Sequence, residues 1–199
     1  MSPAGTTYID LIRHGEPEGG KRYRGQIDDP LSERGWRQMW DAVGDRAPWQ
    51  QIVTSPLARC HAFAAALAER HALPLAVDAR LMEIGFGRWE GRTADELRAE
   101  DPEQLTRFYH DPVNARPAGA EPLAAFQSRV IAGFADLVRA YPQRQVLVVT
   151  HAGVMRAVVA HVLGAPIEAL YRIDVAYAAL TRIRYDGERP PTLVMDPRQ

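Results

Sequence analysis

Short apolar runs alternate along the chain with longer stretches in which apolar residues recur every three or four positions. Three runs end in charged, polar or glycine residues and predict buried strands: Tyr8–Ile12, Gln51–Thr54 and Val146–Thr150. Each run precedes a pattern that predicts a helix, at Ser32–Val43, Leu57–Ala72 and Ala152–Leu163 in turn. This alternation predicts an α/β fold, a three-layer α/β/α sandwich with a mostly parallel central sheet.

The stretch between the second and third of these units carries helical signals of its own. Thr93-Ala94-Asp95-Glu96 has the spacing of a capping box, and Leu123–Tyr141 has apolar residues at helical spacing, so we expect a helical insertion. Leu75–Val77 and Leu180–Tyr185 are further candidate strands. We expect the second of them at a sheet edge, because no helix obviously follows it. Asp111–Pro122 is typical of a surface loop or an active-site flap.

Length and composition favour one domain over residues 1–199, with 46% apolar and 25% charged residues. The formal net charge is −1 and no basic stripe is present, which argues against a nucleic-acid partner. The first residues lack the pattern of a signal peptide, and no run approaches the ~20 apolar residues of a membrane span. We therefore expect a cytoplasmic protein without a membrane partner. The sequence leaves the oligomeric state open.

Polar residues that can bind a phosphate follow each of the three strands. They are Arg13-His14-Gly15-Glu16, then Ser55-Pro56-Leu57-Ala58-Arg59, then His151-Ala152-Gly153. Ligands of open α/β sheets collect beyond the carboxyl ends of the strands, so we expect these residues to converge. A phosphate monoester is recognised by several inward-pointing cationic or N–H donors, and Arg13, Arg59 and His151 can supply them.

A neutral histidine among such donors can act as a phosphoryl acceptor. His14 would attack through one unprotonated ring nitrogen, while backbone near Gly15 holds the other nitrogen and fixes the tautomer. The leaving oxygen must then be protonated, and we assign this role to Glu83, whose apolar neighbours favour a raised pKa. Glu90 is the alternative acid. Cys60 is the only cysteine, so neither a disulfide nor a cysteine-based zinc cluster is expected.

Four segments resemble, in order and spacing, those of the histidine phosphatase (phosphoglycerate mutase-like) superfamily: Leu11–Glu16, Ser55–Arg59, Glu83–Gly91 and Val149–Gly153. The resemblance implies the α/β sandwich, a phosphate pocket without metal or other cofactor, and a small phosphate monoester as the substrate. It implies the following roles: Arg13, His14, Arg59 and His151 in the phosphate pocket, His14 as the phosphorylated residue, and His14, Glu83 and His151 as the catalytic set.

The expected substrate contacts lie outside this pocket. They are Arg22, Tyr23, Arg24, Gly25, Gln26, Trp89 and His110. Within the superfamily, the segments around Arg59 and Trp89 look most like those of α-ribazole phosphatases, which implies hydrolysis of α-ribazole 5'-phosphate in cobalamin synthesis. Pro17 stands where the family often has Thr, and residues 18–20 replace a region that often supplies Asn, so minor phosphate contacts differ.

Three other functions fit parts of the pattern. Phosphoglycerate mutases share the phosphate segments, but they are usually longer, because extra segments shield the phosphohistidine from water; this chain therefore favours hydrolysis. A phosphatase of broad specificity toward sugar and organic phosphates is the second alternative. An anion-binding or partner-binding module without catalysis is the third, and it would ordinarily have lost the nucleophile or one of the arginines, all of which this chain retains.

Overall fold

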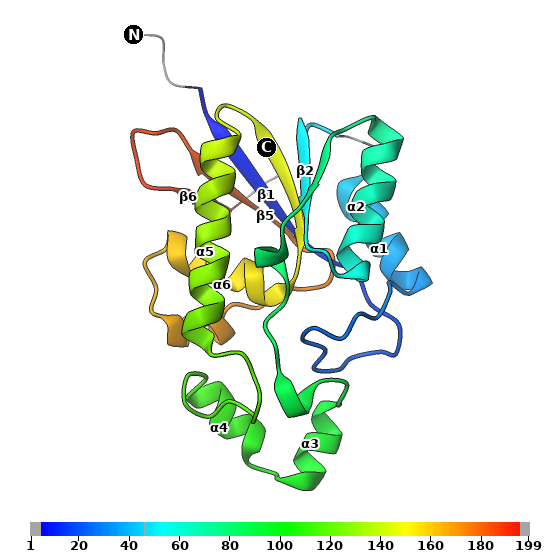
Figure 1. Ribbon diagram of the computed structural model, residues 1–199, viewed down its shortest axis with the longest axis vertical. Helices are drawn as coiled ribbons and strands as arrows, with labels where there is room; N and C mark the ends of the chain where they lie inside the picture. Colours follow the sequence, from blue (N-terminus) through cyan, green and yellow to red (C-terminus); the bar gives the residue numbers. More distant parts are fainter. Residues whose placement is uncertain (1–4, 46, 196–199) are drawn as a thin grey trace.

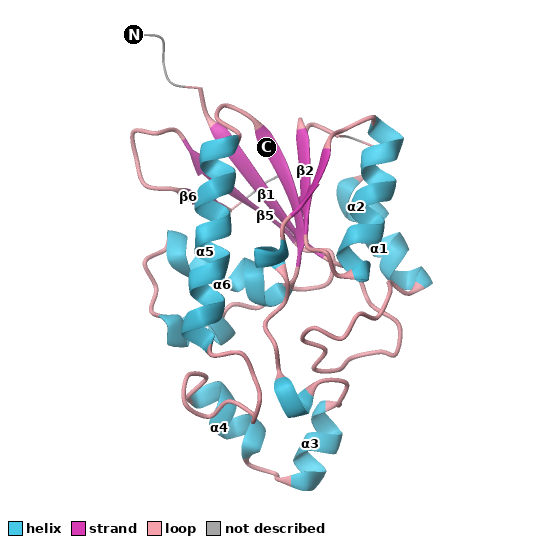
Figure 2. Ribbon diagram, viewed as in Figure 1, coloured by secondary structure: helices cyan, strands magenta, loops and turns pink. Residues whose placement is uncertain are grey.

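A central sheet organises the computed structural model, which describes residues 5–45 and 47–195 (Figures 1 and 2). Within these residues six strands form the sheet: β1 (Thr7–Arg13), β2 (Gln51–Thr54), β3 (Leu75–Val77), β4 (Gln145–Thr150), β5 (Leu180–Tyr185) and β6 (Thr192–Val194). Their order is β3-β2-β4-β1-β5-β6. The first four strands pair in parallel, whereas β5 runs antiparallel to β1 and β6 antiparallel to β5. The mostly parallel sheet predicted from the sequence is confirmed.

Helices cover both faces of the sheet, because alternate strand residues point to opposite sides. In β4, Val146 and Val148 pack in one core cluster with α5 (Leu123–Ala140) and α6 (Ala152–Val162). Leu147 and Val149 pack in a second cluster with α1 (Glu33–Val43) and α2 (Ala58–His71). Burial of β4 on both sides explains its continuous apolar run, and it fixes the three-layer arrangement.

One carboxylate is buried on the face of the sheet that packs against α1 and α2. Asp10 of β1 is fully buried and accepts hydrogen bonds from Trp49 Nε1 at 2.7 Å and Gln145 Nε2 at 2.9 Å. Arg182 of β5 binds both oxygens, Nε to Oδ1 at 2.7 Å and Nη2 to Oδ2 at 3.0 Å. A buried charge is tolerated where it is paired and hydrogen-bonded in this way, so the cluster joins β1, β4 and β5.

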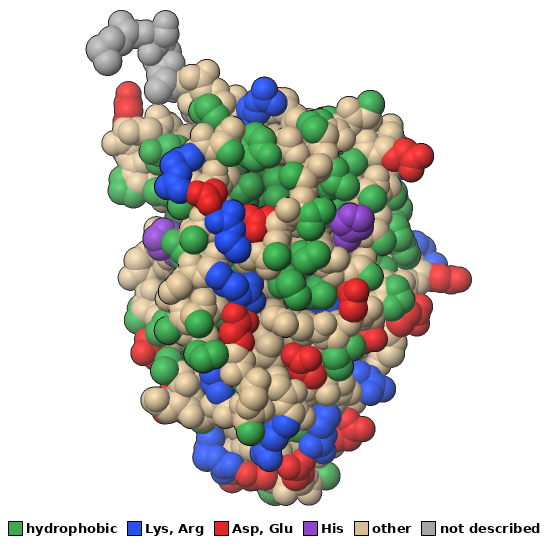
Figure 3. All heavy atoms as spheres, viewed as in Figure 1, with side chains coloured by type: hydrophobic (Ala, Val, Ile, Leu, Met, Phe, Trp, Pro, Cys, Tyr) green, Lys and Arg blue, Asp and Glu red, His purple; other side chains and the backbone are tan. Residues whose placement is uncertain are grey.

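The helical insertion between β3 and β4 is also confirmed. It contains α3 (Ala94–Glu100), α4 (Gln104–His110) and α5, and the capping box of Thr93 and Glu96 is complete at the start of α3. Figure 1 shows α3 and α4 beyond the end of the sheet toward which β1 runs. On the face drawn in Figure 3, basic and acidic side chains are interspersed over this end of the molecule. Ion pairs in the region of α3 and α4 include Arg98 with Asp95 and Arg107 with Asp101.

The prediction of an edge position for Leu180–Tyr185 is wrong, because β6 pairs with β5 on its outer side. β6 has only three residues after two prolines, too few to show an alternating pattern. The helix α4 was missed because it has only seven residues and, unlike α3, no side-chain cap marks its start. Residues 111–122 contain no helix or strand. Their role as a flap, and one domain over residues 1–199, stay predictions.

Three short 3-10 helices complete the description: η1 (Ala79–Leu81), η2 (Gly87–Trp89) and η3 (Ile167–Arg172). Among the described helices, none combines the length and the apolar character that a membrane crossing requires.

Candidate active site

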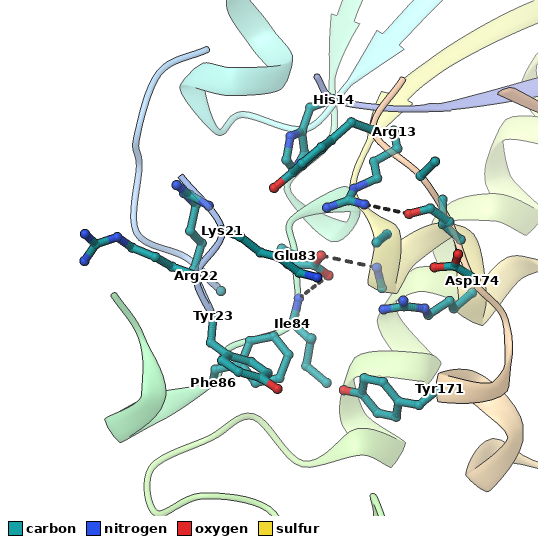
Figure 4. Close-up of a pocket in the computed structure, with 18 of the residues that line it drawn as sticks. Arg13, His14, Lys21, Arg22, Tyr23, Glu83, Ile84, Phe86, Tyr171 and Asp174 are labelled. Atoms are coloured by element: carbon teal, nitrogen blue, oxygen red, sulfur yellow. Dashed lines mark hydrogen bonds between the residues drawn. The ribbon is translucent and has the colours of Figure 1, made fainter. Parts of the chain in front are cut away.

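A cavity of about 550 Å³ opens where β1 ends, and it collects side chains from distant parts of the sequence (Figure 4). Arg13 and His14 come from the end of β1, Arg59 from the first turn of α2, and Gly153 from the start of α6. Glu83 reaches it from the segment between η1 and η2. The convergence expected at the carboxyl ends of the strands is therefore present.

The His14 ring is held in one tautomer. Its Nδ1 lies 2.7 Å from the carbonyl oxygen of Gly15, which can only accept, so Nδ1 carries the proton and Nε2 keeps its lone pair. Gly15 itself packs against α1 so closely that an added Cβ would lie 2.2 Å from the carbonyl oxygen of Gly35. Burial, followed by the charges of Arg59 and Arg13, lowers the pKa of His14 well below its ordinary value. The ring is therefore neutral, as a nucleophile requires.

His151 lies beside His14 but deeper. The two ring centroids are 5.2 Å apart, and His151 is fully buried behind the residues that line the cavity. Its Nε2 shares a hydrogen bond of 2.8 Å with Ser55 Oγ. Burial, and then the charge of Arg59, lower the pKa of His151, so this imidazole is also neutral.

The two arginines leave donors without acceptors at the cavity. Arg59 Nη1 and Nη2 bind the carbonyl oxygens of Ile27 and Gly25 at 2.7 and 2.8 Å, and Arg13 Nη1 binds that of Val175 at 2.6 Å. In both guanidiniums Nε is buried and has no hydrogen-bond partner among the described residues. Because an unmet buried donor is costly, these Nε groups fit an anion that enters the cavity.

Glu83 lies across the cavity from His14 in Figure 4, and its carboxylate is held by backbone amides. Its Oε1 accepts the N–H of Ile84 at 2.9 Å, and its Oε2 accepts that of Gly153 at 3.2 Å. Glu90, the alternative acid, does not line the cavity; its Oε1 accepts the N–H groups of Phe86 and Gln26 instead. The geometry therefore favours Glu83 as the acid.

Most of the loop expected to contact substrate reaches the cavity. Arg22, Tyr23, Arg24 and Gly25 line it, whereas Gln26 does not. Arg24 is buried and spends its donors on the loop, in an ion pair of 2.9 Å with Asp29 and in hydrogen bonds to backbone carbonyls. It thus shapes the loop as well as the cavity wall.

Trp89 and His110, two further expected contacts, do not lie at the cavity. Trp89 is buried, donates from Nε1 to Gln104 at 3.0 Å, and packs beneath Tyr23 at 5.3 Å between ring centroids. His110 is exposed at the end of α4, where its Nδ1 binds the carbonyl oxygen of Thr106 at 2.9 Å. Trp89 therefore supports Tyr23, which lines the cavity, and His110 is the last residue of α4.

Several cavity residues were missed from the sequence. They are Lys21, Ile84, Phe86, Tyr109, Arg156, Tyr171, Asp174, Val175, Ala176 and Tyr177. Residues 174–177 precede β5, which begins opposite the carboxyl end of β1 because the two strands are antiparallel. If Leu180–Tyr185 had been predicted to run antiparallel to the first strand, the loop before it would have been expected at the site. Arg156 lies about one helical turn after Gly153 and therefore on the same face of the helix, so the helical period could have placed it at the site.

Two further observations bear on the chemistry. No group of three or more His, Cys, Asp or Glu side chains within residues 5–45 and 47–195 is arranged to hold a metal ion. Cys60 is buried next to the site, and burial raises the pKa of its thiol. It lies 3.5 Å from His151 Nε2 and serves as packing there.

Comparison with known proteins finds relatives of the family that the sequence motifs resemble. A bifunctional protein of Mycobacterium tuberculosis is 34% identical over 195 residues, which cover 94% of this chain and 53% of that protein. The chain thus spans about half the length of this relative. Phosphoserine phosphatase 1 of Hydrogenobacter thermophilus is 32% identical, with 90% of this chain and 87% of that protein covered. The structure of the α-ribazole phosphatase of Shigella flexneri superposes with a TM-score of 0.80 at 28% identity and covers 94% of each chain.

The family model of the histidine phosphatase superfamily (branch 1) matches residues 9–196, which include all the residues of the candidate site. The chain belongs to the histidine phosphatase superfamily.

Proposed function

We propose that this protein hydrolyses small phosphate monoesters through a phosphohistidine at His14, without a metal ion. The observation that carries the proposal is the His14 ring, with Nδ1 bound to the Gly15 carbonyl and Nε2 left as the lone-pair nitrogen beside two arginines. Phosphoryl transfer depends mostly on positioning and charge stabilisation, and these groups supply both.

In the first step the phosphate oxygens accept hydrogen bonds from Arg13 and Arg59, including their unpaired Nε donors. Nε2 of His14 attacks phosphorus, the P–O ester bond breaks, and its electron pair leaves on the alcohol oxygen. Glu83, protonated at this stage, donates its proton to that oxygen. His151, which was expected to bind the phosphate, does not line the cavity; its neutral imidazole is hydrogen-bonded to Ser55, packs edge-on against His14 and holds the nucleophile's ring in place.

The second step reverses the role of Glu83. Its carboxylate takes a proton from water while the water oxygen attacks phosphorus, and the P–N bond breaks with its electron pair returning to His14. Inorganic phosphate leaves, and the neutral histidine and the protonated Glu83 are restored. One carboxyl group therefore serves as acid and then as base.

The similarity to α-ribazole phosphatases makes α-ribazole 5'-phosphate one candidate substrate. The test is phosphate release from α-ribazole 5'-phosphate, 3-phosphoglycerate, sugar phosphates and p-nitrophenyl phosphate, with and without EDTA. We expect turnover that resists EDTA, and a label on the protein from radiolabelled substrate that is labile in acid and stable in base.

The His14→Ala variant should lose both turnover and label. Turnover that survives this substitution, or that EDTA abolishes, would exclude the proposed chemistry. Isomerisation of 3-phosphoglycerate primed by a bisphosphate, without release of phosphate, would instead indicate a mutase.

A further inference from the structure

The cavity holds more positive charge than one phosphate group requires. Six cationic side chains line it against two carboxylates, those of Glu83 and Asp174. The cations are Arg13, Lys21, Arg22, Arg24, Arg59 and Arg156. Arg24 is neutralised by Asp29, and Arg13 and Arg59 are assigned to the scissile phosphate. Lys21, Arg22 and Arg156 remain, and none of them forms an ion pair with another described residue.

Arg156 lines the cavity on the wall formed by α6. It lies one turn of α6 beyond Gly153, whose N–H holds the Glu83 carboxylate, and helical side chains lean back toward the N-terminus of their helix. Its Nε donates to the carbonyl oxygen of Ile173 at 2.8 Å, which fixes the guanidinium at the cavity wall. The two Nη groups make no hydrogen bond within the described residues, so they are available to a ligand.

Lys21 approaches from the other wall. Figure 4 shows its side chain extended from the loop after His14 into the cavity, in the direction of Glu83. The ammonium group forms neither a hydrogen bond nor an ion pair with any residue that the structure describes. Arg22, by contrast, donates to the carbonyl oxygens of Gly19 and Gly91, both at 2.8 Å, and so holds the loop. On this wall, Lys21 is therefore the cation that can bind a ligand without giving up another contact.

We infer that Lys21 and Arg156 bind a second anionic group, a carboxylate or a phosphate, on the leaving group of the substrate. This inference rests on the proposed function, because it places the leaving group beyond Glu83 as seen from His14. A carboxylate or phosphate accepts the paired donors of Arg156 and the point charge of Lys21. The preferred substrates are therefore phosphomonoesters that are acidic at both ends. A nucleoside leaving group without a second anion, such as α-ribazole, uses neither residue.

The experiment compares substrates that differ by the second anion alone. O-phosphoserine is paired with O-phosphoethanolamine, 3-phosphoglycerate with glycerol 3-phosphate, and glucose 1,6-bisphosphate with glucose 6-phosphate. The first two pairs report a carboxylate and the third a phosphate. In the wild-type protein we expect kcat/KM to favour the acidic member of at least one pair by about tenfold or more, as two partly exposed ion pairs would give.

The Lys21→Met and Arg156→Met variants should each lose most of this preference, while turnover of p-nitrophenyl phosphate changes by less than about threefold. Arg172→Met, an exposed cation outside the cavity, is the control for lost charge and should keep the preference. Lys21 is exposed, so its substitution tests the inference even if Arg156→Met folds poorly.

Two results would overturn the inference. One is ready turnover of p-nitrophenyl phosphate by a wild-type protein that shows no preference in any pair. The other is a preference that survives both substitutions. A wild-type protein that neither hydrolyses p-nitrophenyl phosphate nor forms phosphohistidine would instead refute the proposed function, and the inference would fall with it.

Discussion

Replacing Gly153 by alanine should misplace the proposed acid while leaving the fold intact. A Cβ at this position would lie 2.2 Å from Oε1 of Glu83, where ordinary contact begins at 3.4 Å. The other two contacts, Glu83 Cδ at 3.2 Å and Phe126 Cζ at 3.3 Å, are only slightly tight. The strain therefore falls on the end of a flexible side chain, and we expect the Glu83 carboxylate to move by about 1 Å.

The size of the effect follows from that displacement. A misplacement of about 1 Å can cost about a hundredfold in rate, which is within the usual contribution of a general acid. Stability should change little, because alanine is preferred to glycine in a helix by about 1 kcal/mol and this gain offsets part of the strain. The expected signature is a large loss of activity at an almost unchanged melting temperature.

The assay is kcat/KM for two leaving groups, because this parameter reports the steps up to release of the alcohol. An alkyl phosphate needs protonation of its leaving oxygen, so its kcat/KM should fall about a hundredfold in Gly153→Ala. p-Nitrophenolate departs without a proton, and its kcat/KM should fall less than about tenfold. Glu83→Gln provides the comparison, since it removes the acid without adding an atom.

Equal losses for both leaving groups, in both variants, would refute the reasoning, because they would show that the carboxylate does not act on the leaving oxygen. A collapse of the melting temperature in Gly153→Ala would refute the placement of the strain on Glu83.

Three further predictions concern pH and stability. Burial and the charges of Arg59 and Arg13 lower the pKa of His14, so protonation of His14 should reduce kcat/KM only at a pH below the ordinary histidine pKa of about 6.5. Arg59→Met removes one of these charges and should move this acidic limb of the profile to higher pH. Wild type and variant are measured with the same substrate so that ionisation of the substrate cancels. Asp10→Asn removes the charge that pairs with Arg182 and should lower the free energy of unfolding by about 2–4 kcal/mol, measured by denaturant titration; a loss below about 1 kcal/mol would contradict the account of this cluster. Thr93→Ala removes the cap of α3 and should cost about 1 kcal/mol in the same titration, without changing kcat for p-nitrophenyl phosphate.

The sequence predicted the parts of the molecule that depend on local pattern. The apolar runs that became β1, β2 and β4 are buried on both faces, and the residues that follow them meet at one edge because parallel strands share a direction. The contact between His14 and the backbone of Gly15 is also local, since the two residues are adjacent.

What the sequence did not predict depends on contacts between distant segments. Arg156 and Asp174 carry no motif, and they reach the cavity only because α6 starts at the site and the loop before β5 returns to it. Trp89 lies within the matching segment Glu83–Gly91, yet its indole N–H donates inward to Gln104, which no pattern near Trp89 indicates. Such orientations are set by packing among elements far apart in the chain.

The position of Lys21 has a practical consequence. It is the only lysine in the chain, whose other basic side chains are all arginine or histidine, and it stands at the cavity. Amine-directed chemistry will therefore modify one side chain at the substrate entrance, apart from a terminal amine. Coupling to an amine-reactive surface should orient the protein with its cavity toward the support, and a small amine-reactive fluorophore should report on ligand entry from a single, known place.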